Sequence, residues 1–360
     1  MRTYFIKTYG CQMNDADSAR LAEVLESHGY LPIGESGYPQ ADIILVNTCC
    51  VRQNAEDVAL QYVASLKGLK KKNPEMVIGV CGCVATEPGI DIKKRYPHVD
   101  LVLGPNEPEK LKEFLKPLTP FSPSPLVRGK GKYKGDRGEV VIMHGCDNFC
   151  SYCIVPYVRG REVSRPIAEI LEEVGRKIEQ GAKEIILLGQ NVNSYKYGLA
   201  DLLYQIPNHL KAYRPMGPRV SFLTSHPKDM SDEIIDAVAK LPYMAKEFML
   251  PLQSGDDEIL KKMNRGYDLD HYRGRIKKIR GLLPRARIST DILVGFPGET
   301  EEQFQNTLKA VEEMRFNEVH MFAYSPRPGT PAAKLSDQLP QKVVKGRLQR
   351  LIKIVHSLLS

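Results

Sequence analysis

Short apolar runs alternate with amphipathic segments along most of this chain, and that alternation limits its possible folds more than any other feature. It is typical of βα units and of mostly parallel sheets. In the first third of the chain, we predict strands at 3–9, 42–47, 76–82 and 100–103. Four strands with helices between them predict a small α/β domain of the doubly wound, Rossmann-like type.

Six further strand-like runs follow, at 139–143, 184–188, 219–224, 248–252, 288–294 and 319–324. Six βα units predict a partial TIM-type (β/α)6 barrel, whose active site is expected at the carboxyl ends of the strands. Between the two parts lies a stretch rich in Pro, Ser, Gly and Lys, which is typical of a linker. We therefore predict an N-terminal domain at 1–118, a linker at 119–138 and a barrel domain at 139–360.

Length, charge and cysteine content narrow the class of protein. The 360 residues suggest two domains, at roughly 150 residues per domain. The net charge of +8 suits a polyanionic partner. We find neither a signal peptide nor an apolar run long enough for a membrane span, so we expect a cytoplasmic protein without membrane contact. Eight cysteines in a reducing compartment indicate metal or redox chemistry rather than disulfides.

Three cysteines form a C-x₃-C-x₂-C motif directly after the strand predicted at 139–143; they are Cys146, Cys150 and Cys153. Iron–sulfur clusters are held by cysteine thiolates, normally four. Three close thiolates without an obvious fourth predict a cluster with one open coordination position. The alternative is a structural zinc ion, but zinc motifs usually add a second ligand pair, which is not found nearby.

Three more cysteines, Cys11, Cys49 and Cys83, each follow one of the first three predicted strands. In a parallel sheet these positions share one carboxyl edge, where open α/β sheets bind ligands. We therefore predict a second three-thiolate site, with small buried core residues as the alternative. Cys50 and Cys81 are expected to point away from this edge and to be dispensable.

Several motifs resemble a known enzyme family. The C-x₃-C-x₂-C motif is similar to the signature of radical S-adenosylmethionine (SAM) enzymes, and TYGCQMN, NTCCVR and GCVA resemble the methylthiotransferases. The segments GCDNFCSYCIVPYVRGRE, LLGQNVNSY, TSHPKD, PLQSG, MNRGY, TDILVGFPGET and YSPRPGTPAA resemble the branch that modifies isopentenyladenosine in tRNA. The resemblance runs from residue 3 to about residue 350. Family members continue into an RNA-binding TRAM module, which we expect to be absent from this chain.

The resemblance implies a mechanism with two 4Fe-4S clusters and two SAM molecules. The cluster at Cys146, Cys150 and Cys153 would cleave SAM to a 5′-deoxyadenosyl radical that abstracts hydrogen from C2 of the target adenine. The auxiliary cluster at Cys11, Cys49 and Cys83 would carry the sulfur to be inserted. The implied partners are the anticodon stem-loop of tRNA, an electron donor such as flavodoxin or ferredoxin, and a sulfur donor. We expect a monomer, and beyond the two clusters no catalytic residue is assigned.

Polar residues and a glycine near the strand ends are candidates for SAM binding. They are Gln190, Asn191, Ser225, Gln253, Arg265, Asp291 and Gly295. Arg265 could pair with the methionine carboxylate through its planar fork, and Gly295 would let the backbone approach the adenine or ribose. The alternative for each residue is loop solvation or helix capping. Arg159 and Arg161 follow the cluster loop and are candidates for RNA phosphate contacts, with a solvated surface as the alternative.

Other functions remain open from the sequence. A sibling enzyme would act on threonylcarbamoyladenosine in tRNA or on an aspartate of a ribosomal protein. A protein of another class would carry iron–sulfur clusters or transfer electrons. Such a carrier would not need a six-unit barrel with polar residues at its strand ends.

Overall fold

The computed structural model describes residues 1–51, 53–116, 136–210 and 218–359. The chain divides into two compact units. Unit 1 is Met1–Gly131 with Tyr157–Gly160, and unit 2 is Lys132–Pro156 with Arg161–Ser360. Most of the predicted linker, 119–138, lies outside the described residues.

Unit 1 contains a five-stranded, fully parallel sheet in the order β2-β1-β3-β4-β5. Its strands are β1 (Thr3–Thr8), β2 (Leu31–Pro32), β3 (Ile43–Thr48), β4 (Val77–Gly82) and β5 (Leu101–Leu103). The four predicted strands are confirmed, with bounds shifted by a residue or two, and β2 was not predicted. The doubly wound α/β class is therefore confirmed.

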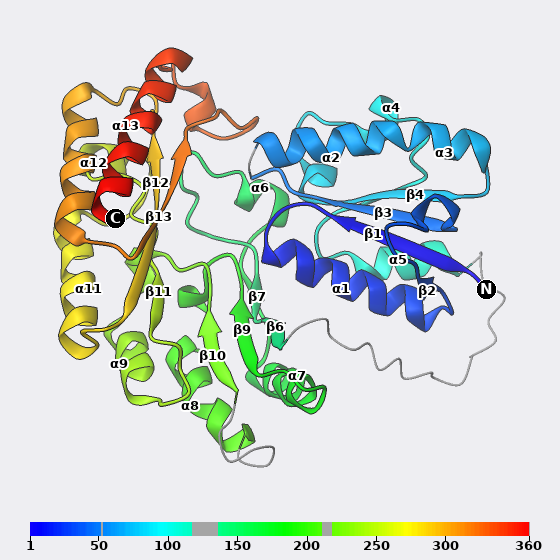
Figure 1. Cartoon of the computed structure of the whole chain (residues 1–360), viewed down its shortest axis with the longest axis horizontal. Coiled ribbons are helices and arrows are strands. Elements are labelled where there is room, and N and C mark those ends of the chain that lie inside the picture. The colour runs from blue at the N-terminus through cyan, green and yellow to red at the C-terminus, as the bar shows by residue number, and fades with distance from the viewer. Residues whose placement is uncertain (52, 117–135, 211–217, 360) are drawn as a thin grey trace. The chain divides into compact units, whose positions relative to one another are not determined.

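Helices cover both faces of this sheet, with α2 and α3 on one face and α1 and α5 on the other (Figure 1). The helices of unit 1 are α1 (Gln12–Ser27), α2 (Gln53–Ser65), α3 (Lys67–Lys72), α4 (Ile92–Arg95) and α5 (Pro108–Leu115). All six residues of the central strand β3 are buried. A strand buried on both faces reads as a continuous apolar run, which explains why the sequence marks it so clearly.

Unit 2 carries two three-stranded parallel sheets that follow one another along the chain. The first contains β6 (Arg137–Val141), β9 (Glu184–Leu188) and β10 (Arg219–Phe222), and the second contains β11 (Glu247–Met249), β12 (Arg287–Val294) and β13 (Glu318–Ala323). A parallel bridge between Val220 and Met244 links β10 to the segment before β11. The six predicted strands and the partial-barrel class are confirmed.

Helices follow the barrel strands, as βα units require (Figure 1). They are α6 (Val155–Arg159), α7 (Ile167–Glu179), α8 (Leu199–Leu210), α9 (Asp232–Lys240), α10 (Asp257–Lys262), α11 (Leu269–Leu282), α12 (Glu301–Met314) and α13 (Gln341–Leu359). A short antiparallel pair, β7 (Met143–His144) with β8 (Val163–Ser164), brackets the cysteine loop. Among the described residues, no helix has the length and apolar character needed to cross a membrane.

Candidate functional site

The cysteines that follow β1, β3 and β4 lie at the carboxyl edge of the sheet in unit 1. Cys11 immediately precedes α1, Cys49 follows β3, and Cys83 begins a short 3₁₀ helix after β4. Cys49 and Cys83 are buried, whereas Cys11 is exposed. The backbone at Gly10 has a φ of +133°, and a Cβ added there would lie 2.6 Å from the Cβ of Cys49. Only glycine permits this close approach of the Cys11 turn to Cys49.

Two buried asparagines hold this edge together. Asn14 Nδ2 donates to Asn47 Oδ1 at 3.1 Å and to the carbonyl of Thr48 at 3.0 Å, while Asn47 Nδ2 donates to the carbonyl of Asn14 at 2.8 Å. Both side chains are fully buried. The Cys11 thiol donates to Asn14 Oδ1 at 3.4 Å. Sequence reasoning missed this pair; its only signal is a polar side chain within the otherwise apolar run of β3.

The two extra cysteines behave differently from each other. Cys81 lies in the apolar core of unit 1, as expected. Cys50, which we expected to point away from the site, interacts with Cys83, and a side-chain hydrogen bond between the two thiols raises the pKa of Cys50. That Cys50 is dispensable stays a prediction. The same hydrogen bond, followed by the charge of Arg159, lowers the pKa of Cys83. Burial raises the pKa of Cys49 to about 11.

Arg159 does not lie where a phosphate contact would require it. Its Nη2 donates to Asp17 Oδ2 at 2.9 Å, and the two side chains are only 4% and 5% exposed. Arg159 falls in the short segment that belongs to unit 1. The interpretation of Arg159 as an RNA contact therefore disagrees with its burial. Arg161 has a 71% exposed side chain, which lies over the ring of Phe149 and near Asp147.

In unit 2, the cysteine loop is fastened to the turn that follows α10. The main-chain N–H of Ser151 donates to the carbonyl of Met263 at 2.9 Å, and Ser151 Oγ donates to the carbonyl of Lys262 at 2.8 Å. Asn264 Nδ2 donates to the carbonyl of Phe149 at 3.0 Å. This turn carries the MNRGY motif, so the motif supports the loop that holds Cys146, Cys150 and Cys153.

Arg265 reaches the cysteine loop directly. Its Nη1 donates to Cys150 Sγ at 3.3 Å and to the hydroxyl of Tyr152 at 3.4 Å. Nη2 donates to the carbonyl of Pro251 at 2.8 Å, and Nε donates to the Tyr267 hydroxyl at 3.1 Å. The residue is 4% exposed. All three side-chain nitrogens of Arg265 donate hydrogen bonds within the protein, one of them to the candidate cluster ligand Cys150. No nitrogen is therefore reserved for the SAM carboxylate that we predicted Arg265 to hold.

His226, which follows Ser225 after β10, is a second neighbour of Cys150. Burial, followed by the charges of Arg265 and Lys228, lowers the pKa of His226 to about 2, so its ring is neutral. Nδ1 accepts the main-chain N–H of Lys228 at 3.3 Å, which leaves the proton on Nε2. Nε2 lies 3.9 Å from Cys150 Sγ. The ring can thus donate toward sulfur.

Three of the polar residues near the strand ends carry unpaired buried oxygens. Within the described ranges, Gln190 Oε1, Asn191 Oδ1 and Ser225 Oγ have no hydrogen-bond partner. Such atoms are rare in folded proteins, and these three can accept hydrogen bonds from a bound polar group. Gln253 is also buried and adopts a φ of +71°, and its N–H donates to the carbonyl of Asp291, which lies in β12. These residues fit a polar cofactor such as SAM.

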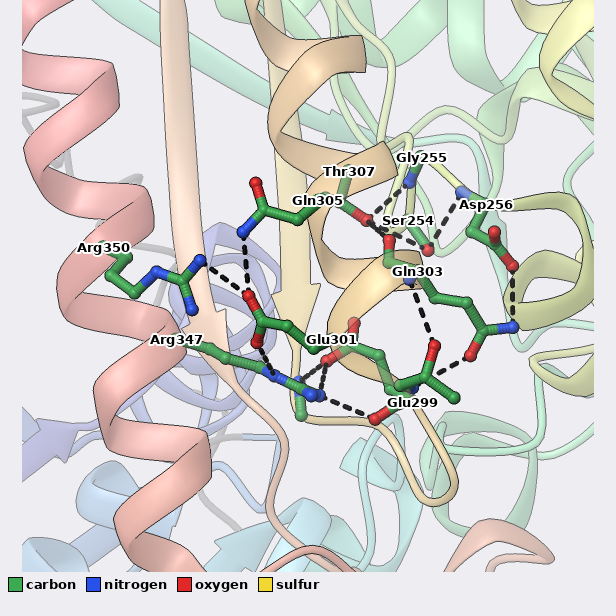
Figure 2. A network of polar contacts seen from close by, with 12 residues as sticks. Ser254, Gly255, Asp256, Glu299, Glu301, Gln303, Gln305, Thr307, Arg347 and Arg350 are labelled. Atoms are coloured by element: carbon green, nitrogen blue, oxygen red, sulfur yellow. Dashed lines mark hydrogen bonds and ion pairs between the residues drawn. The ribbon is translucent and has the colours of Figure 1, made fainter.

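Gly295 is engaged elsewhere. A Cβ at this position would lie 2.7 Å from Val344 of α13, and the Gly295 N–H donates to Glu299 Oε2 at 2.9 Å. Packing against the last helix and a φ of +79° account for the glycine, and its contact with SAM stays a prediction. Figure 2 shows the polar network around Glu299, Arg347 and Glu301 that fastens this loop.

Cysteine thiolates are the usual ligands of iron–sulfur clusters, and three of them belong to the C-x₃-C-x₂-C motif. In the part of the chain that the structure describes, no three side chains of His, Cys, Asp or Glu are grouped to hold one metal ion. A four-iron cluster takes each thiolate on a different iron atom, so its ligands need not converge on one point. Each of the two sets supplies three free thiols, Cys11, Cys49 and Cys83 in one and Cys146, Cys150 and Cys153 in the other.

Known proteins match the whole chain. A relative from Pelotomaculum thermopropionicum, named tRNA-2-methylthio-N(6)-dimethylallyladenosine synthase, is 44% identical over 98% of this chain and 82% of its own length. One of the same name from Bacillus licheniformis is 41% identical over 99% of this chain and 72% of its own. The chain belongs to the tRNA-2-methylthio-N(6)-dimethylallyladenosine synthase family. The Radical SAM superfamily model matches residues 140–311, and that of the Uncharacterized protein family UPF0004 matches residues 3–104.

Solved structures agree with this family assignment at the level of the fold. The radical S-adenosylmethionine methyltransferase TsrM from Kitasatospora setae has a TM-score of 0.71 at 16% identity, over 92% of this chain and 75% of its own. The cobalamin-dependent S-adenosylmethionine radical enzyme OxsB has a TM-score of 0.61 at 12% identity, over 99% of this chain and 56% of its own. At such low identity the likeness shows a shared fold alone.

Proposed function

We propose that this chain is a radical SAM enzyme that inserts a methylthio group at C2 of N6-isopentenyladenosine in tRNA, with two SAM molecules and two 4Fe-4S clusters. The observation that carries the proposal is that a relative named for this tRNA product is 44% identical over 98% of this chain, which itself carries two separate sets of three cysteines. The Radical SAM match contains Cys146, Cys150 and Cys153. The second family match contains Cys11, Cys49 and Cys83.

The first set would hold the cluster that cleaves SAM by one-electron chemistry, which side chains alone do not supply. Arg265 and His226 then act on Cys150 as hydrogen-bond donors to sulfur. Such donors orient a ligand and tune its metal centre. The unpaired oxygens of Gln190, Asn191 and Ser225 would take the polar groups of SAM.

The second set would hold the cluster that carries the sulfur to be inserted. Cys83, with its lowered pKa, is suited to bind iron as a thiolate. The exposure of Cys11 leaves one side of this set open to a substrate. The buried Asn14 and Asn47 fix the backbone around it.

The tRNA substrate would meet positive charge on the protein. Arg161, which pairs with Asp147, keeps a 71% exposed side chain near the cysteine loop. It lies 4.9 Å from the centre of the Phe149 ring, which limits its freedom. We propose that Arg161 contacts the tRNA backbone, because exposed arginines are the usual partners of phosphates.

Anaerobic reconstitution followed by nucleoside mass spectrometry tests this function. We expect about eight irons per chain, on a four-iron cluster stoichiometry. Reduction should cleave SAM, and treated tRNA should gain the methylthio product. Replacing Cys146, Cys150 and Cys153 with Ala should abolish SAM cleavage. Replacing Cys11, Cys49 and Cys83 with Ala should keep cleavage but abolish the product.

The other functions give different results in the same experiment. An iron–sulfur carrier would bind about four irons and would not cleave SAM. An enzyme for threonylcarbamoyladenosine or for a ribosomal protein aspartate would cleave SAM but leave isopentenyladenosine unchanged. The names of the relatives favour the isopentenyladenosine substrate.

A further inference from the structure

Arg159 lies six residues after Cys153 in sequence, yet it belongs to the unit that holds the other cysteine set. The segment Tyr157–Gly160 is part of unit 1. Thr86 Oγ1 donates to the carbonyl of Val158 at 3.0 Å and to the carbonyl of Cys83 at 3.2 Å. The end of α6 is therefore tied to the turn that begins with Cys83.

The guanidinium of Arg159 is almost completely enclosed. Its side chain is 4% exposed, and Nη2 is held by Asp17. Its Nη1 is buried and has no hydrogen-bond partner among the residues that the structure describes. A buried donor without a partner is costly and calls for a ligand. Asp17 fixes the plane of the guanidinium and thereby the direction of the remaining donor.

The guanidinium of Arg159 also interacts with the set formed by Cys11, Cys49 and Cys83. Arg159 interacts electrostatically with Cys83, Cys11 and Cys49. Arg159 thus carries one unpaired, buried donor and lies within electrostatic range of three candidate thiolate ligands. Their sulfurs, or those of a bound cluster, are acceptors of matching charge.

We propose that Arg159 is a positioning residue for the second cluster, and that its guanidinium, oriented by Asp17, donates an N–H hydrogen bond to a sulfur atom at the site of Cys11, Cys49 and Cys83. This inference rests on the proposed second cluster. Hydrogen bonds to the sulfurs and nearby positive charge stabilise the reduced state of a cluster and raise its reduction potential. Arg159 therefore makes this cluster easier to reduce.

The test uses the full-length chain in which Cys146, Cys150 and Cys153 are replaced with Ala, so that only the second cluster forms. After anaerobic reconstitution, a redox titration followed by EPR gives the midpoint potential. Arg159→Lys keeps the ion pair with Asp17 but loses the planar fork, and we expect a downward shift. Arg159→Met with Asp17→Asn removes the donor without leaving a lone buried carboxylate, and we expect a larger downward shift.

A matched control removes another ion pair of the same unit. Lys70 pairs with Asp100 at 2.9 Å in a partly buried position. Lys70→Met should leave the potential unchanged. With nitrogen-15-labelled arginine, pulsed EPR of the reduced parent cluster should show a nitrogen coupling that Arg159→Lys removes.

An unchanged potential in both Arg159 variants overturns the inference and leaves the second cluster intact. So does the absence of a nitrogen coupling that depends on Arg159. A parent chain that binds no iron overturns the second cluster and the inference together. The two failures are thus told apart by the iron content of the parent.

Discussion

Arg347, in α13, donates from Nη1 to the Glu299 carboxylate at 2.6 Å and to its main-chain oxygen at 2.8 Å (Figure 2). Both side chains are buried. Glu299 also accepts the N–H of Gly295, so one carboxylate joins the last helix to the loop that follows β12. The C-terminal helix therefore holds a loop at the carboxyl end of a barrel strand, where active-site groups are expected.

Arg347→Met should strongly destabilise unit 2. Breaking a buried ion pair by removing one partner leaves an uncompensated charge and costs about 3–5 kcal/mol. Arg350→Met is the matched control on the same helix, because its pair with Glu301 is about half exposed, and such pairs contribute up to about 1 kcal/mol. Denaturant unfolding of both variants measures the difference. Equal losses would show that the Arg347 pair does not anchor the loop.

Glu299→Gln should change how stability depends on pH. Burial raises the pKa of Glu299 in the folded chain, whereas an unfolded glutamate titrates near about 4.3. The folded state then binds this proton more tightly, so the contribution to stability is present below about pH 4.3 and is lost as pH rises through the folded pKa. Unfolding free energies from about pH 4 upward should therefore fall for the parent relative to Glu299→Gln. A relative rise would contradict the raised pKa.

The strands were predictable because each buried strand is a short, local run of apolar residues. The range 184–188 was predicted with the bounds of β9 (Glu184–Leu188), whose last four residues are buried. The two-residue β2 was missed since it is too short to show a period, and both of its residues are exposed. The pair β7 with β8 was missed for the same reason: two-residue strands carry no pattern.

The position of Cys11, Cys49 and Cys83 at one edge of the sheet was predictable from topology. The pairing of Arg159 with Asp17 was not. Parallel strands bring residues that follow them to one edge, whatever their distance in sequence. Arg159 and Asp17 are 142 residues apart. An arginine in a basic segment has the same local pattern whether it meets a phosphate or a distant buried carboxylate, so the fold alone decides.

Arg265→Lys should weaken the cluster at the C-x₃-C-x₂-C motif. Lysine keeps the charge but cannot donate to Cys150, Pro251 and Tyr267 from one rigid plane. Loss of such an outer-shell contact typically costs about 10- to 100-fold in metal affinity or activity, and we expect a loss of this size here. Iron retention during chelator challenge and SAM cleavage rate measure the effect. Arg275→Lys, which pairs with Asp232, is the control and should retain both.

Asn47→Ala should loosen the second cysteine set. It leaves the Asn14 amide without one of its acceptors and removes two donated hydrogen bonds. Each buried polar group left unpaired costs about 1–3 kcal/mol. Unfolding measurements should show this loss, and iron bound at Cys11, Cys49 and Cys83 should fall. Asn54→Ala, on the exposed side of α2, should stay within about 0.5 kcal/mol. A null effect at Asn47 would contradict a supporting role.

Cys50 and Cys83 are hydrogen-bonded neighbours, but only Cys83 should bind iron. Cys50 comes directly after Cys49 and is fully buried, and the positions that follow β1, β3 and β4 are already held by Cys11, Cys49 and Cys83. The pKa of Cys83 is lowered, which favours the thiolate that metals require. In the chain with Ala at Cys146, Cys150 and Cys153, Cys50→Ala should keep about four irons, and Cys83→Ala should lose them. Equal loss in the two variants would make Cys50 a ligand as well.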